Sequence, residues 1–93
     1  MATVRNIQTR IRRIEGFDTR YQHYNGRDVM DNKQNLPRYP FSKAARGAIT
    51  VAQWKEQRIY KAYPGFKVAV FNSRGRKVNG RTLLETVRRT YGI

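Results

Sequence analysis

The sequence predicts a small α+β domain spanning residues 1–93, with antiparallel β-hairpins and three to four helices. Three observations carry this prediction. A stripe of apolar residues at helical spacing opens the chain, two segments alternate at period two before a glycine-containing turn, and two capping-box patterns precede helical segments. A chain of 93 residues can bury roughly 60 to 65% of its unfolded surface, so we expect one domain that folds without disulfide or metal staples.

The charge narrows the classes of function. Twenty Lys and Arg residues against six Asp and Glu give a net charge of +14, and fourteen of the cations are arginine. The planar guanidinium matches phosphate oxygens and stacks on bases. Self-repulsion at this charge costs folding stability, so we expect a polyanionic partner, with nucleic acid ahead of an acidic protein or a lipid. A surface that is merely solubilised is the alternative reading of the same charge.

Other features of the composition exclude some chemistry. The absence of cysteine excludes Cys-ligated zinc, iron–sulfur clusters and thiol catalysis. The longest apolar run covers residues 68–71, far short of a membrane span, and the N-terminus lacks the apolar core of a signal peptide. We therefore expect an intracellular, cytoplasmic protein, associated with a nucleoid or another nucleoprotein.

The first helix is predicted by Val4, Ile7, Ile11 and Ile14, which fall within roughly 80° of one another on a helical wheel. Gly16 stands where a C-cap would stand. The arginines at positions 5, 12 and 13 then lie on the opposite side, either as a solvated face or as phosphate contacts.

A first hairpin is predicted over residues 17–30. Residues 17–24 alternate, Asn25-Gly26 suits a two-residue turn, and residues 27–30 would return as a strand. If the first aromatic residues face the core, Arg20, Gln22 and Tyr24 face outward, as a stacking and phosphate-pairing set of the type used on single-stranded nucleic acid. A half-exposed sheet would show the same pattern.

A surface loop over residues 31–39 and a pair of helices are expected next. Pro40 suits the first turn of a short helix over residues 41–46, and Gly47 suits its left-handed end. Thr50 and Gln53 form a capping box for a second helix that begins at Val51 and is stopped by Pro64. Trp54 falls off the edge of the apolar stripe of this helix, and Gln53, Lys55 and Arg58 are the side chains that it could offer to a groove of DNA.

The second hairpin is the more informative one. Its strand, residues 66–71, would bury Phe66, Val68 and Val70 and present Lys67, Ala69 and Phe71. Its turn carries Arg74, Arg76 and Lys77 around Gly75, which suits close approach to a phosphate backbone, although a flexible charged turn looks alike. A capping box at Thr82 and Glu85 then begins the last helix, with Leu83, Leu84, Val87 and Tyr91 on one stripe.

The predicted element order, helix, strand, helix, helix, strand, basic turn, strand, resembles that of winged-helix DNA-binding domains, although the long connection over residues 27–39 departs from that pattern. The resemblance implies a helix-turn-helix with a basic wing. The rival arrangement is an antiparallel four-stranded sheet with helices packed on one face, which would move the binding surface to Arg20, Tyr24, Lys67 and Phe71.

Catalysis is not expected. His23 is the only imidazole, and the six carboxylates are scattered; Asp18, Asp28 and Asp31 could meet across the first hairpin, but no spacing demands a metal there. Neither a glycine-rich phosphate loop nor an HExxH motif occurs. We therefore expect no enzyme activity, no cofactor and no bound metal.

The sequence thus predicts a small, basic, non-catalytic nucleic-acid-binding protein, with duplex DNA first and RNA or single strands second. The alternative is a module that binds an acidic protein partner, as an inhibitor or as a subunit of a nucleoprotein complex, anchored by aromatic residues such as Trp54 and Tyr60. The expected nucleic-acid contacts are Gln53, Lys55, Arg58, Lys67, Arg74, Arg76, Lys77, Arg20 and Tyr24.

Overall fold

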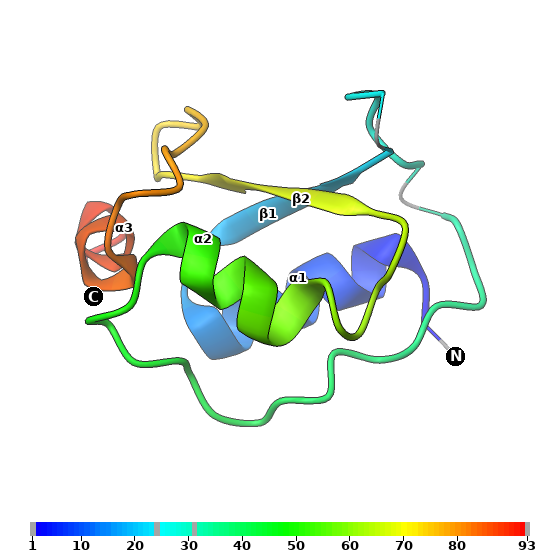
Figure 1. Cartoon of the computed structure of the whole chain (residues 1–93), viewed down its shortest axis with the longest axis horizontal. Coiled ribbons are helices and arrows are strands. Elements are labelled where there is room, and N and C mark those ends of the chain that lie inside the picture. Colours follow the sequence, from blue (N-terminus) through cyan, green and yellow to red (C-terminus); the bar gives the residue numbers. More distant parts are fainter. Residues whose placement is uncertain (1, 24, 31, 93) are drawn as a thin grey trace.

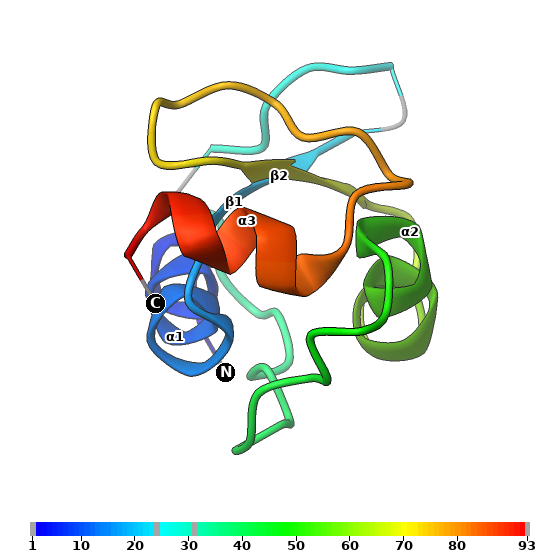
Figure 2. The same ribbon diagram turned by 90° about the vertical axis from the view of Figure 1, so that its left-hand side faces the viewer.

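The computed structural model describes residues 2–23, 25–30 and 32–92 and has an α+β fold. Its elements in chain order are α1 (Val4–Glu15), β1 (Asp18–Gln22), α2 (Val51–Trp54), the π-helical turn η1 (Lys55–Ile59), β2 (Lys67–Phe71) and α3 (Leu84–Thr90). The two strands pair antiparallel, and the three α-helices lie on one side of the sheet (Figures 1 and 2). The expected α+β class is confirmed.

Helix α1 forms as its sequence predicts. Val4, Ile7 and Ile11 are buried, while the Thr3 side chain accepts the N–H of Asn6 at the start of the helix. Gly16 ends the helix with φ +87°, a left-handed conformation that glycine adopts without strain. The apolar stripe therefore faces the sheet.

The two strands show clear inward and outward faces. Residue pairs Thr19↔Val70 and Tyr21↔Val68 are buried on the inner face, and Phe17 meets Trp54 edge to face with ring centroids 5.0 Å apart. Both expected hairpins form, but each returning segment makes only an isolated bridge, Gln22↔Asp28 in the first and Phe71↔Lys77 in the second. The described sheet therefore has two strands with one short flanking segment on each side, rather than the four strands of the rival arrangement.

The turn of the first hairpin differs from the expected two-residue form. The N–H of His23 donates to the carbonyl of Arg27 (2.8 Å), so the loop is longer than Asn25-Gly26 alone. Gly26 has φ +87°. The Asn25 side chain accepts the N–H of Arg27 (3.0 Å).

The middle helix is shorter than its sequence predicts, and its second half is not α-helical. The Thr50–Gln53 capping box is present, but after Trp54 the helix continues as a single π-helical turn. Hydrogen bonds to the fifth residue bring side chains five positions apart to the same side, which is how Trp54 and Ile59 both reach the core. The sequence placed Trp54 at the edge of the stripe because it assumed regular α-helical spacing.

The last helix is confirmed, but its predicted cap is wrong. Leu83, not Thr82, occupies the N-cap position and makes no side-chain hydrogen bond there. The N–H of Leu84 donates to the carbonyl of Ile49 (2.9 Å), and the N–H of Glu85 donates to that of Gly47 (3.1 Å). Backbone carbonyls of the loop that precedes α2 thus replace the expected side-chain cap of α3.

The expected helix over residues 41–46 does not form. Three guanidinium groups bind the carbonyls of alternate residues in this segment: Arg10 binds those of residues 39 and 41, Arg58 that of residue 43 and Arg88 that of residue 45. A helix would need the same carbonyls for its own ladder. Gly47 has no left-handed φ; a Cβ there would lie 2.9 Å from the Cβ of Glu85, so this glycine permits close packing against α3. The helix-turn-helix is therefore not formed.

Helices and loops leave one face of the sheet uncovered. Figure 1 shows α1 and α2 beneath the strands, α3 at one end, and the chain after residue 32 running along the far side. In Figure 2 the turns of the two hairpins lie above the sheet, on the side away from the helices. Within the described ranges, no helix covers this outer face of β1 and β2.

Candidate nucleic-acid interface

The outer face of the sheet carries polar and charged residues toward its ends and a small residue, Ala69, near its centre. The pairs Asp18↔Phe71, Arg20↔Ala69 and Gln22↔Lys67 present their side chains here. The guanidinium carbon of Arg20 lies 5.9 Å from the Phe71 ring centroid, and Ala69, the register partner of Arg20, is buried. Phe71 keeps part of its ring accessible.

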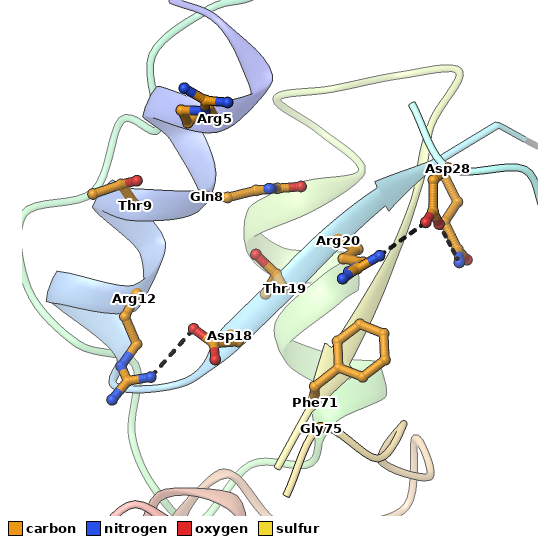
Figure 3. A pocket seen from close by; sticks show the side chains of 11 residues that line it. Arg5, Gln8, Thr9, Arg12, Asp18, Thr19, Arg20, Asp28, Phe71 and Gly75 are labelled. Atoms are coloured by element: carbon orange, nitrogen blue, oxygen red, sulfur yellow. Dashed lines mark hydrogen bonds and ion pairs between the residues drawn. The ribbon is translucent and has the colours of Figure 1, made fainter. Parts of the chain in front are cut away.

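A groove of about 780 Å³ runs from α1 across β1 toward the second hairpin. Figure 3 shows α1 on one side of it and β1 on the other, with the side chains of both turned toward the space between them. One face of helix α1 forms a wall of the groove through residues 5, 8, 9 and 12, because positions three and four apart lie on the same side of a helix. The lining residues are Arg5, Gln8, Thr9, Arg12, Asp18, Thr19, Arg20, Gln22, Asp28, Phe71 and Gly75.

Two arginines of the groove are held in place by carboxylates. Arg12 pairs with Asp18 (3.2 Å) and stacks on the Tyr91 ring at 4.3 Å. Arg20 pairs with Asp28 (3.1 Å). Both pairs are well exposed, and exposed pairs of this kind contribute only about 0 to 1 kcal/mol to stability, so an anionic ligand could replace either carboxylate.

Asp28 is also bound by an amide. The hydrogen bond from Gln22 Nε2 (3.2 Å) and the pairing with Arg20 lower the pKa of the Asp28 carboxyl below its usual value. Asp28 therefore stays negatively charged at neutral pH. It positions Arg20 but also partly neutralises the groove.

The turn of the second hairpin, residues 72–77, is called the basic turn below. The Asn72 side chain accepts the N–H groups of Arg74 (2.9 Å) and Arg76 (3.1 Å), and Gly75 takes φ +77°. The backbone of the turn is thus ordered by its own hydrogen bonds, while both arginines and Lys77 are exposed. Gly75 lines the end of the groove, so the basic turn and the groove are continuous.

The remaining predicted contacts divide between this surface and other places. Lys67 is exposed on the outer face of β2. The pKa of the Lys55 ammonium group is lowered, first by burial and then by the positive charge of nearby Lys77. Gln53 is exposed, but its side-chain oxygen is engaged in the cap of α2 (2.9 Å). Tyr24 lies outside the described residues.

Arg58 is directed into the protein. Its Nη1 donates to Glu15 Oε2 (2.8 Å) and to the carbonyl of Lys43 (2.6 Å), and its guanidinium covers the Phe41 ring at 4.3 Å. Its side chain is only 18% exposed. The structure therefore does not bring Arg58 together with the other predicted contacts.

Sequence reasoning did not place the helix wall in the site. Arg5 and Arg12 were left between a solvated face and a phosphate contact, and Gln8 and Thr19 were not considered. The spacing of residues 5, 8, 9 and 12 marks one helical face, and the strand that follows after a single turn returns beside it. This polar stripe was the available signal.

The described residues show neither a metal site nor a membrane-spanning helix, and comparisons with known proteins do not assign a function. Among the residues that the structure describes, no three His, Asp or Glu side chains gather as metal ligands would. Asp31, one of the aspartates considered for a metal, is not described. In the described part of the chain, no helix has the length and apolar character needed to cross a bilayer. Comparison with protein-family models, curated proteins and solved structures finds no match to this chain.

Proposed function

We propose that the protein is a small, non-catalytic nucleic-acid-binding protein whose contact surface is the groove together with the basic turn. The observation that carries the proposal is the convergence of exposed arginines from α1 and β1 on one groove, which continues into the basic turn. Phosphate contacts of this kind supply most of the affinity of non-specific binding.

The charges along this surface set the expected strength of binding. Six exposed cations border it: Arg5, Arg12, Arg20, Arg74, Arg76 and Lys77. Glu15, which is buried, is not available to oppose them, and Asp18 and Asp28 each hold one arginine. An open sheet face with a partly accessible aromatic ring also suits stacking of unpaired bases, so single strands gain support relative to the duplex DNA that the sequence put first.

Binding is tested by fluorescence anisotropy with labelled duplex DNA, single-stranded DNA and RNA hairpins at several salt concentrations. If all six cations neutralise phosphates, log Kd changes with log salt by about 5 for duplex and about 4 for single strands. No binding of any of these near physiological salt would overturn the proposal and leave an acidic protein as the partner.

Three matched variants locate the surface. Replacing Arg5, Arg12 and Arg20 by alanine removes the groove cations, and replacing Arg74, Arg76 and Lys77 removes those of the basic turn. Each triple is expected to weaken binding and to reduce the salt dependence by about 2 to 3. The control triple replaces Arg38, Lys43 and Arg46, which are exposed on the segment that runs along the far side of the protein. An equal loss in the control would mean that net charge alone drives binding.

A further inference from the structure

Thr19 places unused hydrogen-bonding groups on the groove. Thr19 is only 5% exposed, and its hydroxyl has no hydrogen-bond partner in the described structure. Figure 3 shows this side chain between β1 and the side chains of α1. A buried hydroxyl without a partner is uncommon in native proteins and calls for an explanation.

The backbone of Thr19 is left open as well. Tyr21 turns its N–H and C=O away from β2, donating to Gln8 Oε1 (3.1 Å) and accepting from the N–H of Val29 (2.8 Å). Since the direction of these groups alternates along a strand, those of Thr19 also point away from β2. The returning segment bonds only at Tyr21 and His23, so the N–H and C=O of Thr19 have no partner among the described groups.

One short stretch of the β1 edge thus offers a donor, an acceptor and a hydroxyl within a groove that arginines border. A nucleotide has three parts that match this setting: a base edge with alternating donors and acceptors, an aromatic face and a phosphate. Phe71 supplies a ring on the opposite, outer face of the sheet, and Arg12 and Arg20 line the same groove as Thr19. An acidic peptide would satisfy the charges and the strand edge but would leave the aromatic ring unused.

We propose that Thr19 reads the edge of an unpaired base, so that the protein binds single-stranded nucleic acid and discriminates between bases. This inference rests on the proposed function. It follows because the Watson–Crick edge of a base is exposed only when the base is unpaired, and because sites built around hydrogen bonds reject ligands that leave their polar groups unpaired. Stacking on Phe71 and phosphate contacts are tolerant of sequence, so we expect base preference to arise at Thr19.

The test compares labelled single strands of one base type each with an abasic strand of the same length. The wild-type protein is expected to prefer one base over the least favoured by about tenfold, which corresponds to about 1.4 kcal/mol. Thr19→Val keeps the shape and removes the hydroxyl, and it is expected to reduce this ratio to about twofold without changing the Kd for the abasic strand. Thr19→Ser keeps the hydroxyl and is expected to retain the preference. Thr86→Val, at an exposed position of α3 outside the groove, is the matched control and is expected to keep the wild-type preference.

A second measurement uses the unaltered protein and therefore does not depend on how a variant folds. The NMR signal of the Thr19 amide is expected to shift on addition of the preferred strand and to stay in place with the abasic strand. Equal affinities for all bases, an unchanged ratio in Thr19→Val or an unmoved Thr19 amide would overturn the inference while leaving the proposed function standing. If the protein bound none of the strands, including the abasic one, the proposed function itself would be overturned. Displacement of the preferred strand by poly-glutamate at equal charge would show a peptide site instead.

Discussion

Glu15 and Arg88 are joined twice, once through side chains and once through the backbone. Arg88 Nη2 donates to Glu15 Oε1 (3.0 Å), and Arg88 Nε donates to the carbonyl of Glu15 (2.6 Å). The Glu15 carboxylate is fully buried and also accepts hydrogen bonds from Arg58, the Tyr39 hydroxyl and the N–H of Ala45. This one side chain therefore fixes the end of α1, the segment 39–45, η1 and α3 relative to one another.

Replacing Glu15 by glutamine is expected to lower the free energy of unfolding by about 3 kcal/mol or more. The substitution keeps the shape of the side chain but leaves two largely buried guanidinium groups, 13% and 18% exposed, without a counter-charge. Urea denaturation measures the change. Glu56→Gln, an exposed carboxylate on η1, is the control and is expected to change stability by less than about 0.5 kcal/mol. Equal effects of the two would show that the buried network does not hold the fold together.

Arg58 separates the sequence-based interpretation from the structural one. As a predicted nucleic-acid contact, it would affect binding; as a partner of Glu15 and of the Lys43 carbonyl, it supports the fold. We expect Arg58→Ala to lower the unfolding free energy by about 3 kcal/mol, because it leaves a buried carboxylate with one cation fewer. The Kd of the folded protein for nucleic acid, measured at low temperature, should stay within about twofold of wild type. A large loss of affinity with unchanged stability would restore the sequence-based role.

How far the sequence predicts this fold depends on the range of the interactions involved. Helix α1, both hairpins and the Thr50–Gln53 cap are encoded by residues within a few positions of one another, and these were found. The segment 41–46 was predicted as a helix from Pro40 and Gly47, but its structure is set by arginines at positions 10, 58 and 88. Nothing in the local sequence specifies those partners.

The candidate site was predicted in part for the same reason. The cations of the basic turn and Arg20 could be identified from composition and alternation, since a turn and a strand each display their own side chains. The groove needed α1 to be placed beside β1, and the open edge at Thr19 needed the point at which the first hairpin stops pairing. Both depend on tertiary packing, as does the single π-helical turn that moved Trp54 into the core.

Gly47 is expected to be intolerant of a side chain for reasons of space alone. An added Cβ would lie 2.9 Å from the Cβ of Glu85, and backbone hydrogen bonding between the two residues prevents them from moving apart. Gly47→Ala should therefore cost about 1 to 3 kcal/mol of unfolding free energy. Gly80→Ala is the matched control, since its Cβ would meet that of Ala52 at 3.4 Å. Similar thermal denaturation midpoints for the two variants would contradict the close contact at Gly47.

The buried tyrosines predict a loss of stability at alkaline pH. Burial raises the pKa of Tyr63 to about 12, and burial likewise raises the pKa values of Tyr21 and Tyr39 above their ordinary value of 10.0. Because the folded protein holds these tyrosine protons more tightly, the protonated hydroxyls contribute their full stabilisation at pH values below the pKa of the unfolded state. This stabilisation is lost as the pH rises through the pKa of the folded state. The unfolding free energy should therefore fall between about pH 10 and pH 12.

Tyr63→Phe tests this assignment. Between pH 8 and pH 11 about one of the two pKa units is lost, which corresponds to about 1.4 kcal/mol, so removing the titrating hydroxyl should make the alkaline loss smaller by about that amount. Denaturant titrations at pH 8, 10 and 11, run at about equal ionic strength, measure it. The control is Tyr60→Phe, because Tyr60 is 41% exposed and should not change the pH dependence. An alkaline loss that is identical in wild type and Tyr63→Phe would exclude this tyrosine as a cause.

The two carboxylates of the groove predict a gain of affinity when they are neutralised. Asp18 and Asp28 each occupy an arginine that a phosphate would otherwise contact. Exposed ion pairs are worth less than about 1 kcal/mol, so Asp18→Asn and Asp28→Asn should each tighten nucleic-acid binding by about two- to fivefold without a measurable loss of stability. Glu56→Gln makes the same change in net charge outside the groove. If it tightened binding equally, the effect would come from net charge, and Asp18 and Asp28 would not lie at the contact surface.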